Sequence, residues 1–230
     1  PAHFDKIPAG WSEVSAAQMR ALGIDRADLG SKGDAFSATL YRDLDGRYTL
    51  AFEGTDFGDG RDLQADLRGA VGASDQEKRA VDVAQTVQSS LKANGVSDDA
   101  LVMTGHSLGG ELAAIASVAT GTHAVTFNAA GLSDAAFDYA NDRSTAPQPS
   151  SWTVASQRVT AYMGSGDPLS EAQLRTSAPD SFGQSVTLPT THGSAVDYAM
   201  HFTRQFKMDH ADTLPGAMDR MALQEGTYYH

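Results

Sequence analysis

The sequence predicts an α/β fold, a mostly parallel sheet flanked by helices, on three observations. Short apolar runs at residues 100–104, 124–127 and 159–163 are typical of buried parallel strands. A glycine-rich turn at 105–110 joins the first run directly to a segment whose apolar residues recur at helical spacing. Strands that alternate with helices form parallel sheets, whose reactive loops lie at the carboxyl ends of the strands.

An antiparallel hairpin and a long helix precede these strands. Residues 36–41 alternate apolar and polar side chains, residues 45–46 form an Asp-Gly turn, and residues 48–52 return as the second strand. The helix begins with a capping box, in which Ser74 and Glu77 each satisfy a backbone N–H of the first turn.

The chain is expected to form a single domain over residues 1–230, because no shift in composition divides it. Residues 1–35 are an N-terminal extension, 36–206 the catalytic core and 207–230 a C-terminal tail. Residues 142–156, rich in Pro, Ser, Thr and Asn, favour an exposed loop over a substrate-gating lid.

Charge and cysteine content exclude several classes of function. The chain has 17 Lys and Arg against 29 Asp and Glu, and this net charge of −12 argues against binding nucleic acid or anionic lipid surfaces. The absence of cysteine excludes disulfides, thiolate catalysis and the usual zinc frameworks. No apolar run approaches the roughly 20 residues of a membrane span, and no signal pattern follows Pro1. We expect a soluble chain with a further segment upstream, in a compartment that composition does not fix.

The turn at residues 105–110 places a serine where its hydroxyl can act as a nucleophile. In a G-x-S-x-G nucleophile elbow, the serine lies on a strained strand-to-helix turn, and flanking glycines let the backbone bend. Gly105 and Gly109 hold those positions around Ser107. The helix that begins here points its N–H groups toward a developing oxyanion, and Leu108 would donate one of them. The pattern predicts a serine hydrolase.

A nucleophilic serine needs a base and an acid that orients the base, and in this fold the chain order is serine, acid, histidine. The best acid is Asp167, which follows the strand at 159–163 on a turn of glycines and proline. A turn aspartate that caps its own backbone is the alternative interpretation. Weaker candidates for the acid are Asp134, Asp138 and Asp180.

The predicted base is His192, which lies in a loop before a helical stretch and could approach the elbow. His201 is the alternative, although its apolar neighbours indicate a histidine that packs within a helix. His106 and His123 are expected to be structural. Neither His201 nor His210 has the spacing of a histidine metal site, so no metal or cofactor is expected.

A second oxyanion donor is expected on the loop after the strand at 48–52. Gly54 would permit close approach, and Thr55 would donate from its backbone or hydroxyl. An ordinary strand-ending turn is the alternative. Residues 56–62 contain three aspartates, but their spacing is not that of an EF-hand, which favours a solvated loop over a calcium site.

The order and spacing of short motifs along residues 36–202 are specific as a set. The motifs are Ala51-Phe52-x-Gly54-Thr55, Asp62-Leu63, Asp66-Leu67, Gly105-His106-Ser107-Leu108-Gly109-Gly110, Thr126-Phe127-Asn128 and Gly166-Asp167-Pro168. Together they resemble the class 3 lipases, which include fungal triacylglycerol lipases and plant phospholipases A1. The resemblance implies an α/β-hydrolase fold, a triad of Ser107, Asp167 and His192, and an oxyanion hole of Thr55 and Leu108.

Two departures from that family narrow the expected substrate. Glu53 stands where family members usually carry arginine, so the role of that arginine in holding the loop is lost or rebuilt. Residues 56–62 are short and polar where the fungal lipases place an apolar lid. A short-chain ester or a phospholipid is therefore expected in preference to bulk triglyceride.

The sequence thus predicts a serine carboxylic-ester hydrolase of lipids, a phospholipase A1 or lipase, that transfers the acyl group to Ser107. A second hypothesis keeps this chemistry in a secreted antibacterial effector, delivered by a secretion system and paired with an immunity protein. A non-catalytic binding module with the hydrolase fold is the alternative from another class. A serine peptidase or thioesterase would use the same triad.

Overall fold

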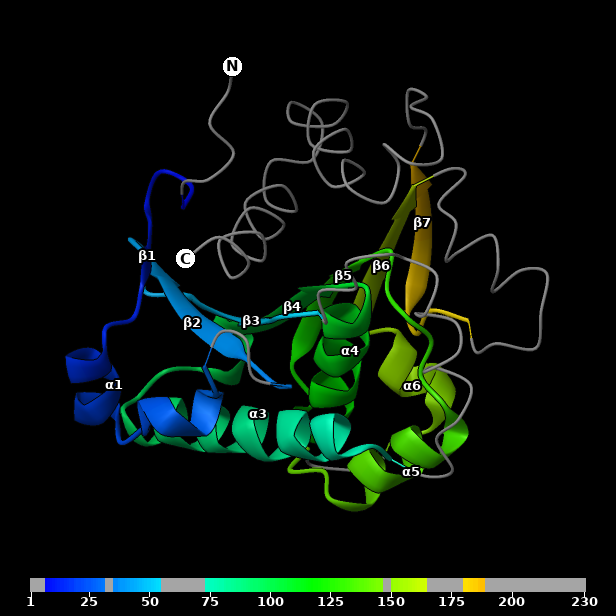
Figure 1. Ribbon diagram of the computed structural model, residues 1–230, viewed down its shortest axis with the longest axis horizontal. Helices are drawn as coiled ribbons and strands as arrows, with labels where there is room; N and C mark the ends of the chain where they lie inside the picture. Colours follow the sequence, from blue (N-terminus) through cyan, green and yellow to red (C-terminus); the bar gives the residue numbers. More distant parts are fainter. Residues whose placement is uncertain (1–6, 32–34, 55–72, 147–149, 165–179, 189–230) are drawn as a thin grey trace.

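The computed structural model describes residues 7–31, 35–54, 73–146, 150–164 and 180–188. Within these residues, a seven-stranded sheet has its strands side by side in chain order, from β1 to β7. Figure 1 shows the helices α3, α4, α5 and α6 gathered on one side of this sheet. The predicted α/β class, with a mostly parallel sheet and flanking helices, is confirmed.

The sheet changes from antiparallel to parallel at β3. The first three strands, β1 (Trp11–Glu13), β2 (Ala38–Asp43) and β3 (Tyr48–Phe52), pair antiparallel, so the predicted hairpin is confirmed. All later neighbours pair parallel: β4 (Leu101–His106), β5 (His123–Phe127), β6 (Val159–Gly164) and β7 (Gln184–Leu188). The carboxyl ends of β3 to β6 therefore meet at one edge of the sheet, where reactive loops are expected.

Helix α4 covers the parallel strands, and α3 packs against α4. Helix α3 (Asp75–Ala93) begins with the predicted capping box, in which both hydrogen bonds between Ser74 and Glu77 are present. Helix α4 (Leu108–Thr120) lies between the sheet and α3, and its residues from Gly109 onward are all buried. A helix that is apolar all round is stable only when it is enclosed, which explains the run of Leu, Ala, Ile and Val.

The N-terminal region and the predicted loop at 142–156 contain further elements. Residues before 36 add a strand to the sheet, because β1 pairs with β2. Helices α1 (Ala16–Leu22) and η1 (Arg26–Leu29) follow β1. Helix α5 (Asp134–Asp142) follows β5, and the short α6 (Trp152–Ser156) falls within residues predicted as loop. The prediction missed α6 because its anchor is distant: the Trp152 ring packs at 4.8 Å from Phe137 and 4.9 Å from Phe182.

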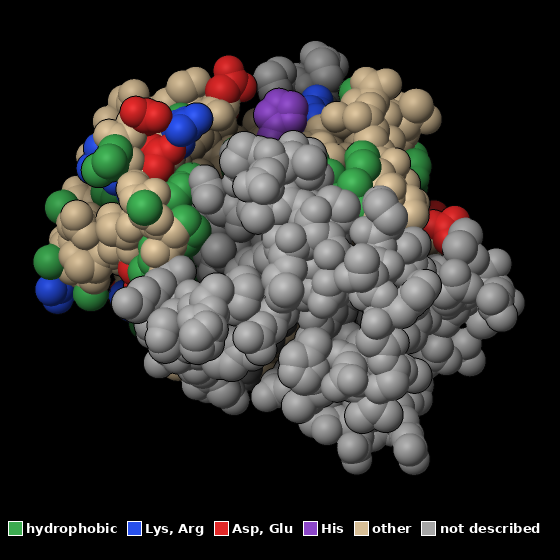
Figure 2. All heavy atoms as spheres, turned by 90° about the horizontal axis from the view of Figure 1, so that it is seen from above, with side chains coloured by type: hydrophobic (Ala, Val, Ile, Leu, Met, Phe, Trp, Pro, Cys, Tyr) green, Lys and Arg blue, Asp and Glu red, His purple; other side chains and the backbone are tan. Residues whose placement is uncertain are grey.

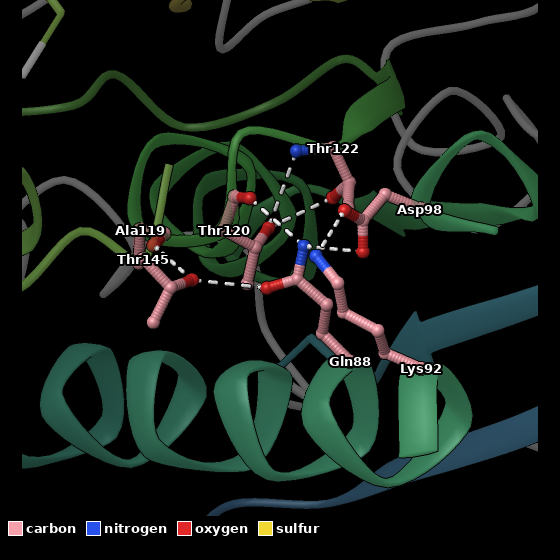
Figure 3. A network of polar contacts seen from close by, with 7 residues as sticks. All are labelled: Gln88, Lys92, Asp98, Ala119, Thr120, Thr122 and Thr145. Atoms are coloured by element: carbon pink, nitrogen blue, oxygen red, sulfur yellow. Dashed lines mark hydrogen bonds and ion pairs between the residues drawn. The ribbon is translucent and has the colours of Figure 1, made fainter. Parts of the chain in front are cut away.

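A polar network, buried at Gln88 and Thr120 and exposed at Lys92, lies at the far end of α4 (Figure 3). The Gln88 side chain, from α3, donates to the Thr120 carbonyl at 2.9 Å and to Asp98, in the short helix η2 (Asp98–Ala100), at 3.2 Å. It also accepts from the Thr145 hydroxyl at 3.0 Å. Lys92 pairs with the same aspartate at 3.0 Å. These bonds satisfy carbonyls that the end of a helix leaves unpaired.

Charged side chains, candidate metal ligands and possible membrane spans were compared over the part of the chain that the structure describes. In Figure 2, charged side chains of both signs lie scattered over the described part of this face. Among the described residues, no group of three or more His, Cys, Asp or Glu side chains could hold a metal ion. None of the helices that the structure describes is long and apolar enough to cross a membrane.

Candidate active site

Ser107 lies on a strained turn between β4 and α4, as the elbow motif predicts. Its backbone has φ 55° and ψ −125°, a conformation that residues with side chains rarely adopt. The side chain makes no capping hydrogen bond with the helix that it precedes. Strain of this kind persists only where the surrounding structure holds it, and it is concentrated at active sites.

The glycines around Ser107 are required by close backbone packing. A Cβ on Gly105 would lie 2.7 Å from the Gly110 nitrogen and closer still to the Gly109 carbonyl oxygen. A Cβ on Gly110 would lie 2.6 Å from that of Ala129. The tight turn therefore excludes every larger residue at these positions.

The start of α4 presents backbone donors beside the serine. Because Leu108 is the first residue of the helix, its N–H has no helical carbonyl one turn back to which it could donate. By contrast, the N–H groups of Gly110 and Glu111 donate to the Ser107 carbonyl at 3.0 and 3.3 Å. The predicted donor Leu108 thus lies directly beside Ser107.

The end of β3 packs against this first turn of α4. A Cβ on Gly109 would lie 2.9 Å from the Gly54 nitrogen and 3.0 Å from the Glu53 carbonyl carbon. Gly54 is therefore next to the elbow, and the following residue is Thr55, the second predicted donor. Thr55 itself lies outside the described residues.

The other predicted triad members also lie outside the described residues. Asp167 follows the last residue of β6, Gly164, by three positions, and His192 follows the last residue of β7, Leu188, by four. The alternative base, His201, is likewise outside the described part of the chain. The structure therefore describes Ser107 and Leu108 of the predicted site, and for the remainder only the strand ends that lead to it.

Two buried carboxyl groups lie in the first turns of α4 and α3. Glu111, in the first turn of α4, is 7% exposed, and Glu77, in the first turn of α3, is 5% exposed. Burial raises the pKa of the Glu111 carboxyl well above its usual value, and the neighbouring Glu77 reinforces this shift. Burial therefore favours the protonated form of the Glu111 carboxyl. The Glu77 carboxylate accepts the Ser74 N–H of the capping box.

His106 precedes the nucleophile but is not suited to be its base. Burial lowers the pKa of this imidazole to about 4. A general base works best with a pKa near the operating pH. The prediction that His106 is structural agrees with this shift.

The strand, strained serine turn and buried helix form a nucleophile elbow within an α/β fold. Residues 2–217 match the family described as phospholipase-like, Tle-like phospholipase domain, and the chain belongs to that family. It is also 39% identical to the extracellular phospholipase A1 of Serratia liquefaciens over 181 residues. That match covers 78% of this chain and 53% of the relative, so the chain spans about half of the relative's length.

Solved structures with a similar chain trace include two hydrolases. The extracellular lipase LipA of Serratia marcescens is 21% identical, with a TM-score of 0.40, over 71% of this chain and 28% of the lipase. Carboxyl esterase 2 of Tuber melanosporum is 15% identical, with a TM-score of 0.38, over 84% of this chain and 81% of the esterase. The family assignment rests on the sequence match.

Two features of the site carried little signal in the sequence. Asn128, after β5, has a positive φ of 40°, and only its place in the motif Thr126-Phe127-Asn128 drew attention to it. Glu111 and Glu77 belong to two different helices, and no local pattern in the sequence links them. An acidic residue inside the otherwise apolar α4 was the available clue, because a buried carboxyl requires a partner or a proton.

Proposed function

We propose that this chain is a serine carboxylic-ester hydrolase that cleaves lipids, a phospholipase A1 in preference to a simple esterase. The observation that carries the proposal is the strained elbow at Ser107 in a chain of the Tle-like phospholipase domain family. The relative of 39% identity is named an extracellular phospholipase A1, which favours cleavage at a glycerol ester. The absence of a long apolar segment after Thr55 favours phospholipid over bulk triglyceride.

The proposed mechanism is acyl transfer through Ser107. His192 takes the proton of the serine hydroxyl, Asp167 orients the imidazole, and the serine oxygen attacks the ester carbonyl. The N–H of Leu108 and the donors of Thr55 stabilise the oxyanion. His192 then protonates the leaving alcohol, and water hydrolyses the acyl-enzyme. No cofactor takes part in these steps.

The resemblance to class 3 lipases supports these roles, because it assigns them by motif. The start of α4 beside Ser107 and the position of Gly54 against it are the geometric support. Extracellular action, delivery as an antibacterial effector and inhibition by an immunity protein are proposals of the same kind. Failure of any binding protein to co-purify from the native host would count against the immunity partner.

The test compares purified protein with its Ser107→Ala variant on nitrophenyl esters of increasing chain length and on labelled phospholipids. Removal of the nucleophile should reduce the rate by about 10⁶-fold, and products should come from the sn-1 position alone. Equal turnover by the two proteins would refute the role of Ser107. Hydrolysis of the nitrophenyl esters with no phospholipid cleavage would instead indicate a simple esterase.

The base is assigned by two further variants. His192→Ala should lose several orders of magnitude in kcat, as expected for a triad member, whereas His201→Ala should keep most of it. The opposite result would make His201 the base. Thermal unfolding of both variants distinguishes a lost base from a lost fold.

A further inference from the structure

Asn128 joins the end of β5 to the end of β6. Its side chain is 2% exposed, and its Oδ1 accepts the N–H of Gly164 at 2.9 Å. Its own backbone N–H donates to the Tyr162 carbonyl at 2.8 Å. Two hydrogen bonds from one residue therefore fix the carboxyl end of β6, the strand that leads to Asp167.

The loop that begins at Asn128 is also bonded to the nucleophile elbow. The N–H of Ser107 donates to the Phe127 carbonyl at 3.1 Å, and the N–H of Ala130 donates to the Ser107 carbonyl at 3.0 Å. Ala129 packs so closely on Gly110 that no side chain fits at position 110. Asn128 thus lies in a short bonded path from the backbone of Ser107 to Gly164.

The backbone of Asn128 shows why its side chain matters. Among the described residues, Ser107 and Asn128 are those other than glycine with a positive φ, and both are in this path. Glycine adopts such a conformation without penalty, and asparagine tolerates it better than most residues. Glycine would relieve the backbone but would leave the buried Gly164 N–H without its acceptor. The amide side chain is therefore the feature that glycine cannot supply.

We infer that Asn128 is a positioning residue: it holds the end of β6, the strand that leads toward the proposed acid Asp167, in register with Ser107. The inference rests on the proposed assignment of Ser107 and Asp167 to the triad. A misplacement of about 1 Å at a reacting group costs up to 10²-fold in rate. Since Asn128 acts through the acid, its loss should affect kcat and the titration of the base more than substrate binding.

The experiment uses Asn128→Gly and Asn128→Ala in the full chain, assayed on a nitrophenyl ester across pH. Both variants should lose about 10- to 100-fold in kcat with KM within about twofold of the wild-type value. The acid limb of kcat/KM should move to lower pH, because a displaced carboxylate stabilises the imidazolium less. Asn128→Ala should also unfold at a lower temperature than Asn128→Gly, since alanine alone bears the strained φ.

A matched control comes from Asn141, whose Oδ1 accepts the backbone N–H of Ser150 at 2.9 Å away from the elbow. Asn141→Ala removes the same kind of bond and should leave kcat and the pH profile unchanged. Wild-type kcat in Asn128→Gly would overturn the inference, because only the backbone conformation would then matter. A fall in kcat with no shift of the acid limb of kcat/KM would also overturn the inference.

A double-mutant cycle separates this inference from the proposed function. In an Asp167→Ala background, Asn128→Gly should cause little further loss, because its effect passes through the acid. A full loss of 10-fold or more in that background would refute the path through Asp167. If Ser107→Ala retains turnover, the proposed function itself fails, whereas inactive Ser107→Ala with fully active Asn128→Gly rejects the positioning role alone.

Discussion

Gly109→Ala tests whether the oxyanion loop must touch the first turn of α4. A Cβ at this position would lie 2.9 Å from the Gly54 nitrogen and 3.0 Å from the Glu53 carbonyl carbon. It would lie closer still to the Phe52 carbonyl oxygen. All three are backbone atoms at the end of β3, so no side-chain rotation can relieve the overlap.

The size of the effect follows from those distances. Carbon atoms in contact prefer separations of about 3.5–4.0 Å, so the end of β3 and the start of α4 must move apart by about 1 Å. Overpacking of this kind costs about 1–3 kcal/mol of the free energy of unfolding. A shift of about 1 Å between Ser107 and the loop that leads to Thr55 should lower kcat/KM by about 10²-fold.

The assay is the initial rate on a short nitrophenyl ester, with thermal unfolding measured in parallel. Gly95→Ala is the matched control, because a Cβ there meets no atom within 4 Å although its φ is +79°. That variant should lose about 1–2 kcal/mol of stability from the left-handed backbone and keep its kcat/KM. Folded Gly109→Ala with kcat/KM within twofold of the wild-type value would refute the proposed contact between loop and elbow.

Three further variants test the carboxyl pair, the polar network and the excluded base. Glu111→Gln should weaken the fall in the free energy of unfolding as pH rises. Because the pKa of the Glu111 carboxyl is raised in the folded protein, its contribution to stability is fully present below the usual value of 4.5 and is lost as pH rises through the folded pKa. Urea unfolding at several pH values, with Glu77→Gln alongside, checks this, and equal slopes against pH for wild type and Glu111→Gln would contradict it. Gln88→Ala should cost roughly 1–3 kcal/mol in the same measurement, because the buried Thr120 carbonyl loses its donor; a change below about 0.5 kcal/mol would show that the network adds no stability. His106→Asn should leave the acid limb of kcat/KM in place, since the pKa of His106 is about 4, and disappearance of the limb would make His106 the base.

Much of the fold could be predicted because its signals are local. The capping box of Ser74 and Glu77, the Asp-Gly turn at 45–46 and the glycines of the elbow each act within a few residues. Their structural meaning therefore does not depend on distant parts of the chain. The order of strands and helices then restricts the sheet to a parallel arrangement with few alternatives.

The features that were missed depend on partners far away in the sequence. Helix α6 is anchored by the packing of Trp152 on Phe182, and the strain at Asn128 is held by bonds to the end of β6. No local pattern encodes such pairs, because propensity is a weak signal where tertiary contacts decide. The acid and base of the triad remain predictions from motif order.

The most direct test of the central claim is covalent labelling of Ser107. The protein is incubated with a fluorophosphonate, which reacts with activated serine hydroxyls, and the modified peptide is identified by mass spectrometry. One adduct is expected, on Ser107; a phospholipid substrate should slow its formation, and Ser107→Ala should not form it. An adduct on a different serine, or phospholipid cleavage that continues with Ser107 fully labelled, would contradict it.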